Sequence, residues 1–238
     1  MPKVDAPGAV QPEALSTPLP CPTRVLARRA FCLGVISSLS LLAHRSGAGD
    51  ASGLYLLPLG AGVSAAELDL VKQALSAVFS EPVGVLSKVE LPKSAYYSPR
   101  SRYRAEKLLD FLRPQLPAGG LRIVGITAVD ISTTKPPHAD WGILGLANID
   151  GGACVLSTFR CHRSAKNAEH ARVRFAKVAV HEVGHTFGLE HCPNRGCLMQ
   201  DGGGTVLTTD GERDLCSSCR KWLLERGFLR VPAAPLPW

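Results

Sequence analysis

The sequence predicts a mixed α/β or α+β fold. Short apolar runs that end at proline or glycine alternate with amphipathic segments long enough to form helices. The chain has 238 residues, of which 45% are hydrophobic, so it can bury one substantial core with a small appendage. No internal repeat is visible. The chain is therefore long enough for a single-domain enzyme.

The first elements are predicted from local signals. The apolar run GLYLLPLG, which begins at Gly53, indicates a buried strand. A helix should follow from Ser64 to about Phe79, because Ser64 and Glu67 form a capping box for its first turn. A second strand is expected over residues 83–86.

The middle of the chain continues the alternation. A loop through AYYSPRSRY should lead to a helix over residues 104–113, which Pro114 ends. The β-branched run LRIVGITAVDI predicts a central strand. WGILGLANID and ACVLSTF are two further strand candidates, and Asp150-Gly151-Gly152 between them is compatible with a hairpin.

The longest predicted helix covers roughly residues 167–187 and stops at Gly188. Its apolar positions recur at helical spacing and form one stripe, which consists of Val173, Ala176, Val180, Val183 and Phe187. A second, polar stripe contains Lys166, His170, Arg174, Lys177, His181 and His185. The helix should pack by the first stripe, and the charged residues of the second are expected to form a solvated face.

The segment HEVGHTFGLEHC, residues 181–192, concentrates groups that bind metal ions. His181 and His185 are one helical turn apart, so their imidazoles can converge on one ion, and Glu182 occupies the general-base position of the HExxH motif. Gly188 can turn the chain and bring His191 back as a third ligand. Three ligands leave one position open, so the pattern predicts a catalytic zinc that hydrolyses amides.

Four cysteines follow at close spacing, and they are Cys192, Cys197, Cys216 and Cys219. Four thiolates at such spacing suit a closed structural zinc site. Two disulfides are the alternative if the protein is exported and oxidised. Cys154 and Cys161 are expected to be small buried thiols without a site.

Together these segments resemble the archaemetzincin family of zinc metalloproteases, which belongs to the metzincin clan. The family pattern is HExxHxxGxxHC, four residues, Cys, any residue, Met, about seventeen residues and CxxC. Its fixed positions are filled here by His181, Glu182, His185, Gly188, His191, Cys192, Cys197, Met199, Cys216 and Cys219. The interval between Met199 and Cys216 is one residue short, and the Gly-rich stretch QDGGGTVLTTDGERD departs from the family where the substrate-facing loop should lie.

The resemblance implies a metzincin-like zincin domain, with a mixed twisted sheet, an active-site helix and a C-terminal region braced by a four-cysteine zinc. It implies His181, His185 and His191 as ligands of the catalytic zinc and Glu182 as base and acid. It also implies Met199 as the Met-turn beneath that zinc. We therefore expect two Zn²⁺ ions per chain, a peptide or small protein as substrate, and a monomer.

The first fifty residues differ in composition from the rest. An arginine pair precedes the apolar run Ala30–Ala43, so residues 1–50 are interpreted as a leader of twin-arginine type or a disordered extension. The run is too short for a permanent membrane anchor. Residues 51–228 should form the metalloprotease domain and 229–238 a proline-rich tail. Export to the periplasm is favoured over the cytoplasm, and sequencing the mature N-terminus distinguishes the two.

The alternative function is a non-catalytic zinc protein with a basic surface for nucleic acid or a protein partner. The formal net charge is +7, but Lys and Arg are scattered, so no specific nucleic acid is expected. A purely structural module also has no use for a glutamate beside three histidines. His138, before a predicted edge strand, is expected to be an exposed histidine without a role in the site.

Overall fold

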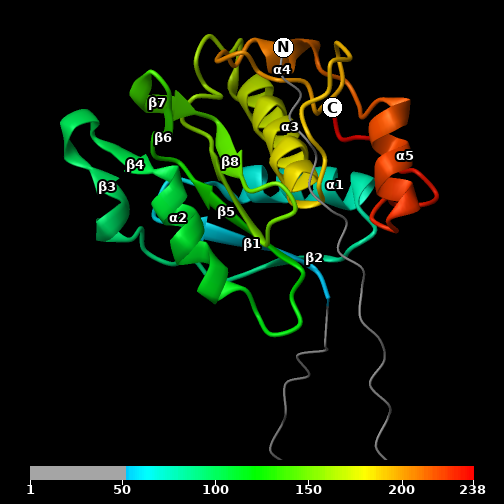
Figure 1. Cartoon of the computed structure of the whole chain (residues 1–238), viewed down its shortest axis with the longest axis horizontal. Coiled ribbons are helices and arrows are strands. Elements are labelled where there is room, and N and C mark those ends of the chain that lie inside the picture. The colour runs from blue at the N-terminus through cyan, green and yellow to red at the C-terminus, as the bar shows by residue number, and fades with distance from the viewer. Residues whose placement is uncertain (1–51) are drawn as a thin grey trace, which may run out of the picture. The chain divides into compact units, whose positions relative to one another are not determined.

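A computed structural model describes residues 52–238 and shows the mixed α/β architecture predicted from the sequence (Figure 1). It contains a five-stranded sheet of order β2-β1-β5-β9-β8 and a four-stranded sheet of order β3-β4-β6-β7. The predicted leader over residues 1–50 lies outside the described residues. Among residues 52–238, the helices are too short or too polar to cross a membrane.

The larger sheet is mostly parallel. It consists of β1 (Leu54–Leu59), β2 (Val83–Val85), β5 (Arg122–Thr127), β8 (Gly145–Ala147) and β9 (Ala153–Ser157). The neighbouring pairs are parallel except β8 with β9, which is antiparallel and places β8 at one edge of the sheet. The hairpin expected around Asp150 is thus confirmed.

Helices cover both faces of this sheet. On one face lie α1 (Ala65–Val78) and α3 (Ala168–Thr186), and on the other lies α2 (Ala105–Leu112) (Figure 1). Successive side chains of a strand point to opposite faces, so Val124 packs with the α1–α3 side and Ile123 with α2. Both layers are buried, which explains why the strands are almost continuously apolar.

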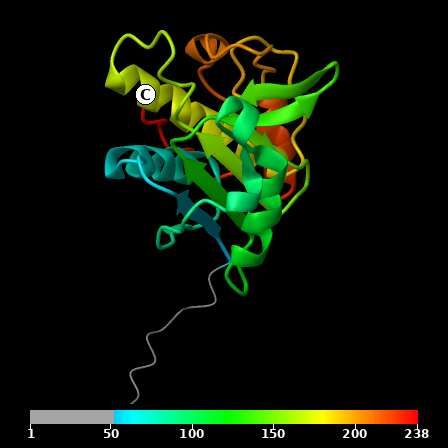
Figure 2. The same cartoon turned by 90° about the vertical axis from the view of Figure 1, so that its left-hand side faces the viewer.

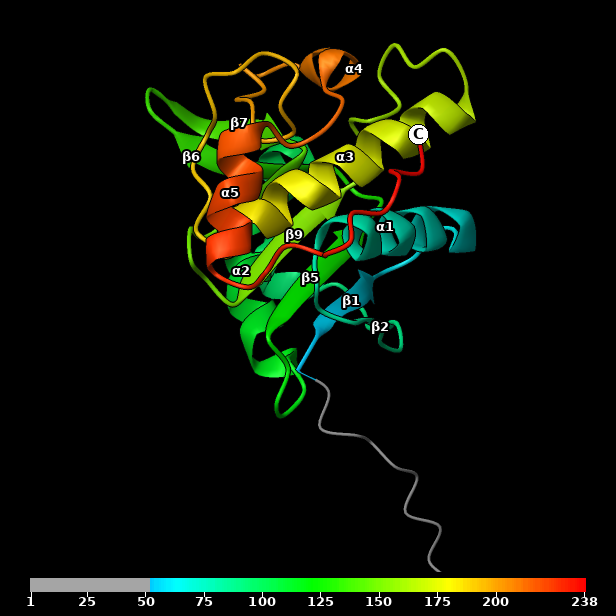
Figure 3. The same ribbon diagram turned by 90° about the vertical axis from the view of Figure 1, so that its right-hand side faces the viewer.

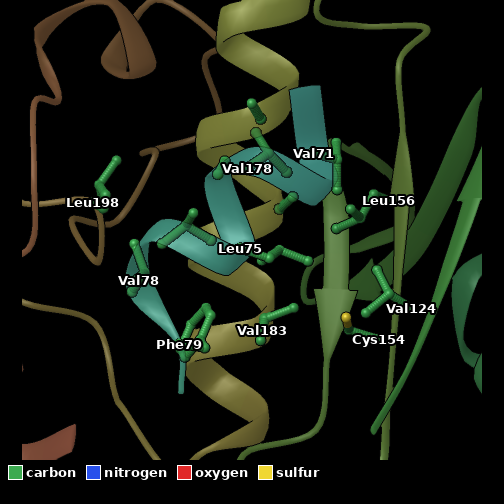
Figure 4. Close-up of a cluster of buried hydrophobic side chains, with 14 of the residues drawn as sticks. Val71, Leu75, Val78, Phe79, Val124, Cys154, Leu156, Val178, Val183 and Leu198 are labelled. Atoms are coloured by element: carbon green, nitrogen blue, oxygen red, sulfur yellow. The ribbon is translucent and has the colours of Figure 1, made fainter. Parts of the chain in front are cut away.

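Figure 4 shows the core between α1, α3 and the sheet. Leu75 and Phe79 at the end of α1, Val183 of α3 and Leu156 of β9 belong to this one cluster. The capping box predicted for α1 is present, because the Ser64 hydroxyl accepts from the Glu67 amide at 3.2 Å while the Glu67 carboxylate accepts from the Ser64 amide at 2.7 Å.

The smaller sheet contains two strands where only a loop was predicted. These are β3 (Tyr96–Tyr97) and β4 (Arg102–Arg104), and the sheet is completed by β6 (Ile131–Lys135) and β7 (His138–Ile143). The two missed strands are very short, and β4 forms through a distant partner, β6. A pairing between residues so far apart leaves no local signal in the sequence.

Two predicted strands are each divided in the structure. The run 121–131 becomes β5 and the start of β6, and the run 141–150 becomes β7 and β8. In both cases the chain leaves one sheet and joins the other. It crosses between the sheets at residues 128–130 and at Leu144, which lie outside the strands. The prediction of single strands was wrong here, since β propensity does not report which sheet a residue joins.

The remaining helices are short. They are the 3-10 helices η1 (Lys93–Ala95), η2 (Ser98–Arg100) and η3 (Arg113–Gln115), and the α-helices α4 (Thr208–Gly211) and α5 (Ser217–Glu225). Figures 2 and 3 show the segment that carries α4 on the same side of the molecule as the β6–β7 hairpin. Figure 3 also shows α5 beside the last turns of α3.

Candidate metal centre

The helix α3 begins and ends as its sequence predicts. The Asn167 side chain caps its start by accepting from the His170 amide at 2.8 Å. Gly188 ends it with a left-handed φ of 86°, its amide donating to the His185 carbonyl at 2.9 Å. This turn reverses the chain, so that His191 returns to the side of the helix that carries His181 and His185.

The imidazoles of His181 and His185 are oriented by carbonyl oxygens. The Nδ1 of His181 lies 2.7 Å from the Leu198 oxygen, and the Nδ1 of His185 lies 2.6 Å from the Leu189 oxygen. A carbonyl only accepts, so each Nδ1 carries the proton and each Nε2 has a lone pair. These two Nε2 atoms are 3.0 Å apart. Two lone pairs this close suit a cation that both can bind.

His191 completes the group. Its ring centroid lies 5.3 Å from that of His181 and 4.9 Å from that of His185, and one ligand atom of each residue lies within 4.8 Å of the others. Burial is the main cause that lowers the pKa of His181 to about 3, and burial also lowers the pKa of His185. The neutral imidazole is the form that binds metals, so the donor set fits zinc.

Glu182 lies next to these histidines and faces the edge strand β8. Its side chain is buried, with 8% of the residue exposed, and burial raises its pKa to about 8. A Cβ atom on Gly145 would lie 2.6 Å from the Glu182 Cγ, so only a glycine leaves room for this carboxylate. Gly145 carried no signal as a site residue in the sequence.

Met199 follows the histidines in the chain and is fully buried. Its sulfur packs against α3 at Gly184, where a Cβ atom would approach it to 2.6 Å. The Met199 carbonyl accepts from the Cys192 amide at 2.7 Å. The methionine loop is therefore attached both to the helix and to the segment that carries His191.

The four cysteines predicted to act together do lie together. The sulfurs of Cys192 and Cys216 are 3.6 Å apart, and those of Cys197 and Cys219 are 3.8 Å apart. Four sulfurs at about 2.3 Å from a tetrahedral zinc are about 3.8 Å from one another. A disulfide requires about 2.05 Å, so these distances fit a metal site and not the alternative of two disulfides.

The exposure of the remaining cysteines and of the polar stripe of α3 tests two further predictions. Cys154 and Cys161 are fully buried free thiols, as predicted. Arg174 and Lys177, however, are 1% and 6% exposed, so the prediction of a solvated face was wrong for both. The guanidinium of Arg174 donates to both oxygens of Asp210 at 2.7 Å. The segment with α4 covers this face, which periodicity alone does not reveal.

A cleft of about 230 Å³ opens beside His181 and His191. Glu182 and the edge-strand residue Gly145 line one side, and the Gly-rich segment around Gly204 lines another. Trp141 of β7 lies against Gly204, where a Cβ atom would be 2.7 Å from the indole ring. His138 is exposed, as predicted, and stacks on Trp141 with a centroid distance of 4.8 Å.

The chain is similar to known proteins over the residues that carry both clusters. The family model described as peptidase family M54 matches residues 65–225. The archaemetzincin of Haloarcula marismortui is 35% identical over 179 residues, which cover 71% of this chain and 98% of that protein.

Two solved archaemetzincin structures share the fold. The structure from Methanopyrus kandleri has a TM-score of 0.64 and 30% identity, and covers 76% of this chain and 98% of its own. The structure from Archaeoglobus fulgidus, a complex with malonate, has a TM-score of 0.61 and 29% identity, and covers 71% and 99%.

Proposed function

Because the chain belongs to peptidase family M54, the archaemetzincins, it is a zinc metallopeptidase, and we propose that it hydrolyses peptide bonds at the three-histidine site. The observation that carries this proposal is the 3.0 Å approach of the Nε2 atoms of His181 and His185, whose Nδ1 atoms face carbonyl oxygens, with Glu182 lining the same cleft as His181. Family membership also favours a peptidase over the alternative of a non-catalytic zinc protein.

In this proposal, His181, His185 and His191 hold the zinc and Glu182 is the general base. Zinc bound there would polarise the substrate carbonyl and lower the pKa of a bound water toward about 7. The Glu182 carboxylate would accept the proton of the attacking water and later pass it to the leaving amine. Its burial against Gly145 holds it at the cleft and keeps bulk water away.

The substrate backbone would lie along β8. This strand is the edge of its sheet, and Leu144 and Gly145 line the cleft beside Glu182. An extended peptide can add to such an edge through main-chain hydrogen bonds. Polypeptides in an extended conformation are therefore the proposed substrates.

We assign the second zinc to the four cysteines as a structural ion. Cys192 directly follows His191, and the Cys216 amide donates to the Cys197 sulfur at 3.3 Å. All four positions of a tetrahedral ion are then filled by protein, so this site has no place for a substrate. Its proposed role is to fix the segment that carries His191 and Met199.

Replacing Glu182 tests the catalytic assignment. Glu182→Ala should lower peptide cleavage by about 10²- to 10⁴-fold, because the proton acceptor is lost, while the zinc content stays unchanged. Cleavage of a peptide mixture followed by mass spectrometry, together with zinc analysis, measures both. Glu169→Ala, at an exposed carboxylate in the first turn of the same helix, is the control. Wild-type cleavage by Glu182→Ala would refute the general-base role.

A further inference from the structure

The cleft continues from the histidines along α3 toward its N-terminus. Val178 lies one helical turn before Glu182, which is about 6 Å along the helix axis. Val206, Thr209 and Glu212 from the segment with α4 line the same cleft, and Lys177, next to Val178, donates to the Thr209 and Glu212 carbonyls. A side chain that enters beside the histidines must therefore be long to reach this end.

The cations that line the cleft are either exposed or already paired. The Arg160 guanidinium donates to both oxygens of Asp130 at 2.7 and 2.9 Å. Lys135 and Arg163 are exposed, and Lys135 lies over the Trp141 ring at 5.8 Å. None of these three cations is therefore a buried charge without a partner.

Glu212, in contrast, is a buried acidic residue of the cleft. Only 4% of this residue is exposed, yet it lines the cleft. Its backbone carbonyl accepts from the Lys177 ammonium at 2.7 Å, which fixes the backbone. Within residues 52–238, its carboxylate forms no hydrogen bond and no ion pair within 4 Å, and the charge of Lys177 acts on it only through space. Burial raises its pKa to about 7, as expected of a carboxylate that water solvates poorly.

A buried carboxylate without a direct hydrogen bond or ion pair is costly, and a cation that enters the site reduces that cost. We propose that Glu212 selects peptide substrates with a lysine or arginine side chain next to the cleaved bond. The long stem of either residue can pass Val178 while its charged group reaches the carboxylate. The proposal deepens the peptidase function described above and rests on it.

Binding without turnover tests this selectivity directly. We would load the Glu182→Ala variant with zinc and titrate it with matched peptides that carry lysine, norleucine or glutamate on either side of the bond. Norleucine has the length of lysine without its charge. In one of the two positions, the lysine peptide should bind at least about tenfold more tightly than the norleucine peptide. Equal affinity, or a preference for norleucine or glutamate, would overturn the proposal.

A second substitution identifies the responsible residue. In the Glu182→Ala background, Glu212→Gln should reduce the lysine preference to within about twofold, because the amide keeps the shape and removes the charge. Glu225→Gln, at an exposed carboxylate on α5, should leave the preference unchanged. A lysine preference that persists in folded Glu212→Gln would refute the assignment of Glu212.

Turnover separates this proposal from the function on which it rests. The wild-type enzyme should cleave the lysine peptide with the higher kcat/KM. If the wild-type enzyme cleaves none of the peptides but Glu182→Ala still prefers lysine, the hydrolytic function fails and the cationic selectivity stands. If cleavage occurs without a lysine preference in either rate or binding, the selectivity fails and the peptidase function stands.

Discussion

Carbonyl oxygens determine how the two imidazoles of α3 are used. The Leu189 carbonyl orients His185 and the Leu198 carbonyl orients His181, and both come from the turn and loop that follow the helix. The spacing of the histidines predicts that they can share an ion, but not which nitrogen faces it. That choice depends on backbone atoms brought in by the fold.

At the same scale, Gly145 should determine the position of the general base. Gly145→Ala places a methyl group 2.6 Å from the Glu182 Cγ, so either the carboxylate or β8 must move. We expect kcat to fall by about tenfold to 100-fold while zinc content and fold persist, because small displacements of catalytic groups have large effects. Steady-state kinetics and circular dichroism measure these quantities.

Gly152 offers a matched control for that substitution. A Cβ atom there would have no neighbour within 4 Å, so Gly152→Ala should retain wild-type kinetics. Equal activity of the two alanine variants would show that the carboxylate tolerates displacement.

At the scale of elements, an ion pair between a buried arginine and a partly exposed aspartate joins α3 to α4. Arg174 is 1% exposed, donates to both oxygens of Asp210, and also donates to the Arg163 carbonyl at 2.7 Å. His170 adds a contact to Asp210 at 2.8 Å. Removing Asp210 would destabilise the protein because the buried Arg174 charge would lose its carboxylate partner. This pair therefore holds the wall of the cleft that contains Glu212.

The pair should make stability depend on pH in acid. The hydrogen bonds from Arg174 are the main cause that lowers the pKa of Asp210 to about 2. A lowered carboxyl pKa stabilises the fold above the unfolded value of about 4, and this contribution is lost as the pH falls toward 2. Wild type should thus exceed Asp210→Asn in unfolding free energy at pH 7, with a difference that shrinks between pH 4 and 2.

Urea unfolding at several pH values measures this difference. Both proteins lose bound metal in acid, so comparing them isolates the pair. Asp69→Asn, at an exposed position of α1, should follow the wild type at every pH. A difference between wild type and Asp210→Asn that is constant from pH 7 to pH 2 would contradict the assignment.

At the scale of the whole molecule, the four-cysteine site should contribute to stability and the histidine site to activity. Cys219→Ser and His185→Ala should each reduce the zinc content from two ions to one per chain. Only Cys219→Ser should lower Tm by more than about 5 °C, because a structural zinc contributes directly to folding free energy. Elemental analysis and differential scanning calorimetry test this division.

The control is internal, because each variant reports on the site that the other leaves intact. A larger loss of Tm in His185→Ala than in Cys219→Ser would reverse the two roles. Two zinc ions in either variant would show that its substituted residue is not a ligand.

The sequence was most informative where structure is local. The capping box at Ser64, the stop at Gly188 and the helical spacing of His181 and His185 all depend on neighbours within a few residues, and all three are present. The strand β4, the burial of Arg174 and the approach of Gly145 to Glu182 depend on distant segments. No local pattern encodes such contacts, so they had to come from the structure.

His191 and Cys192 are consecutive residues that belong to different clusters. One peptide unit, about 3.8 Å between α-carbons, thus joins the proposed catalytic and structural sites. Exchanging α3 alone with another metalloprotease would separate an imidazole ligand from the sulfur framework that supports it. The smallest portable module for building chimeric enzymes is therefore the unbroken stretch from α3 to the end of α5.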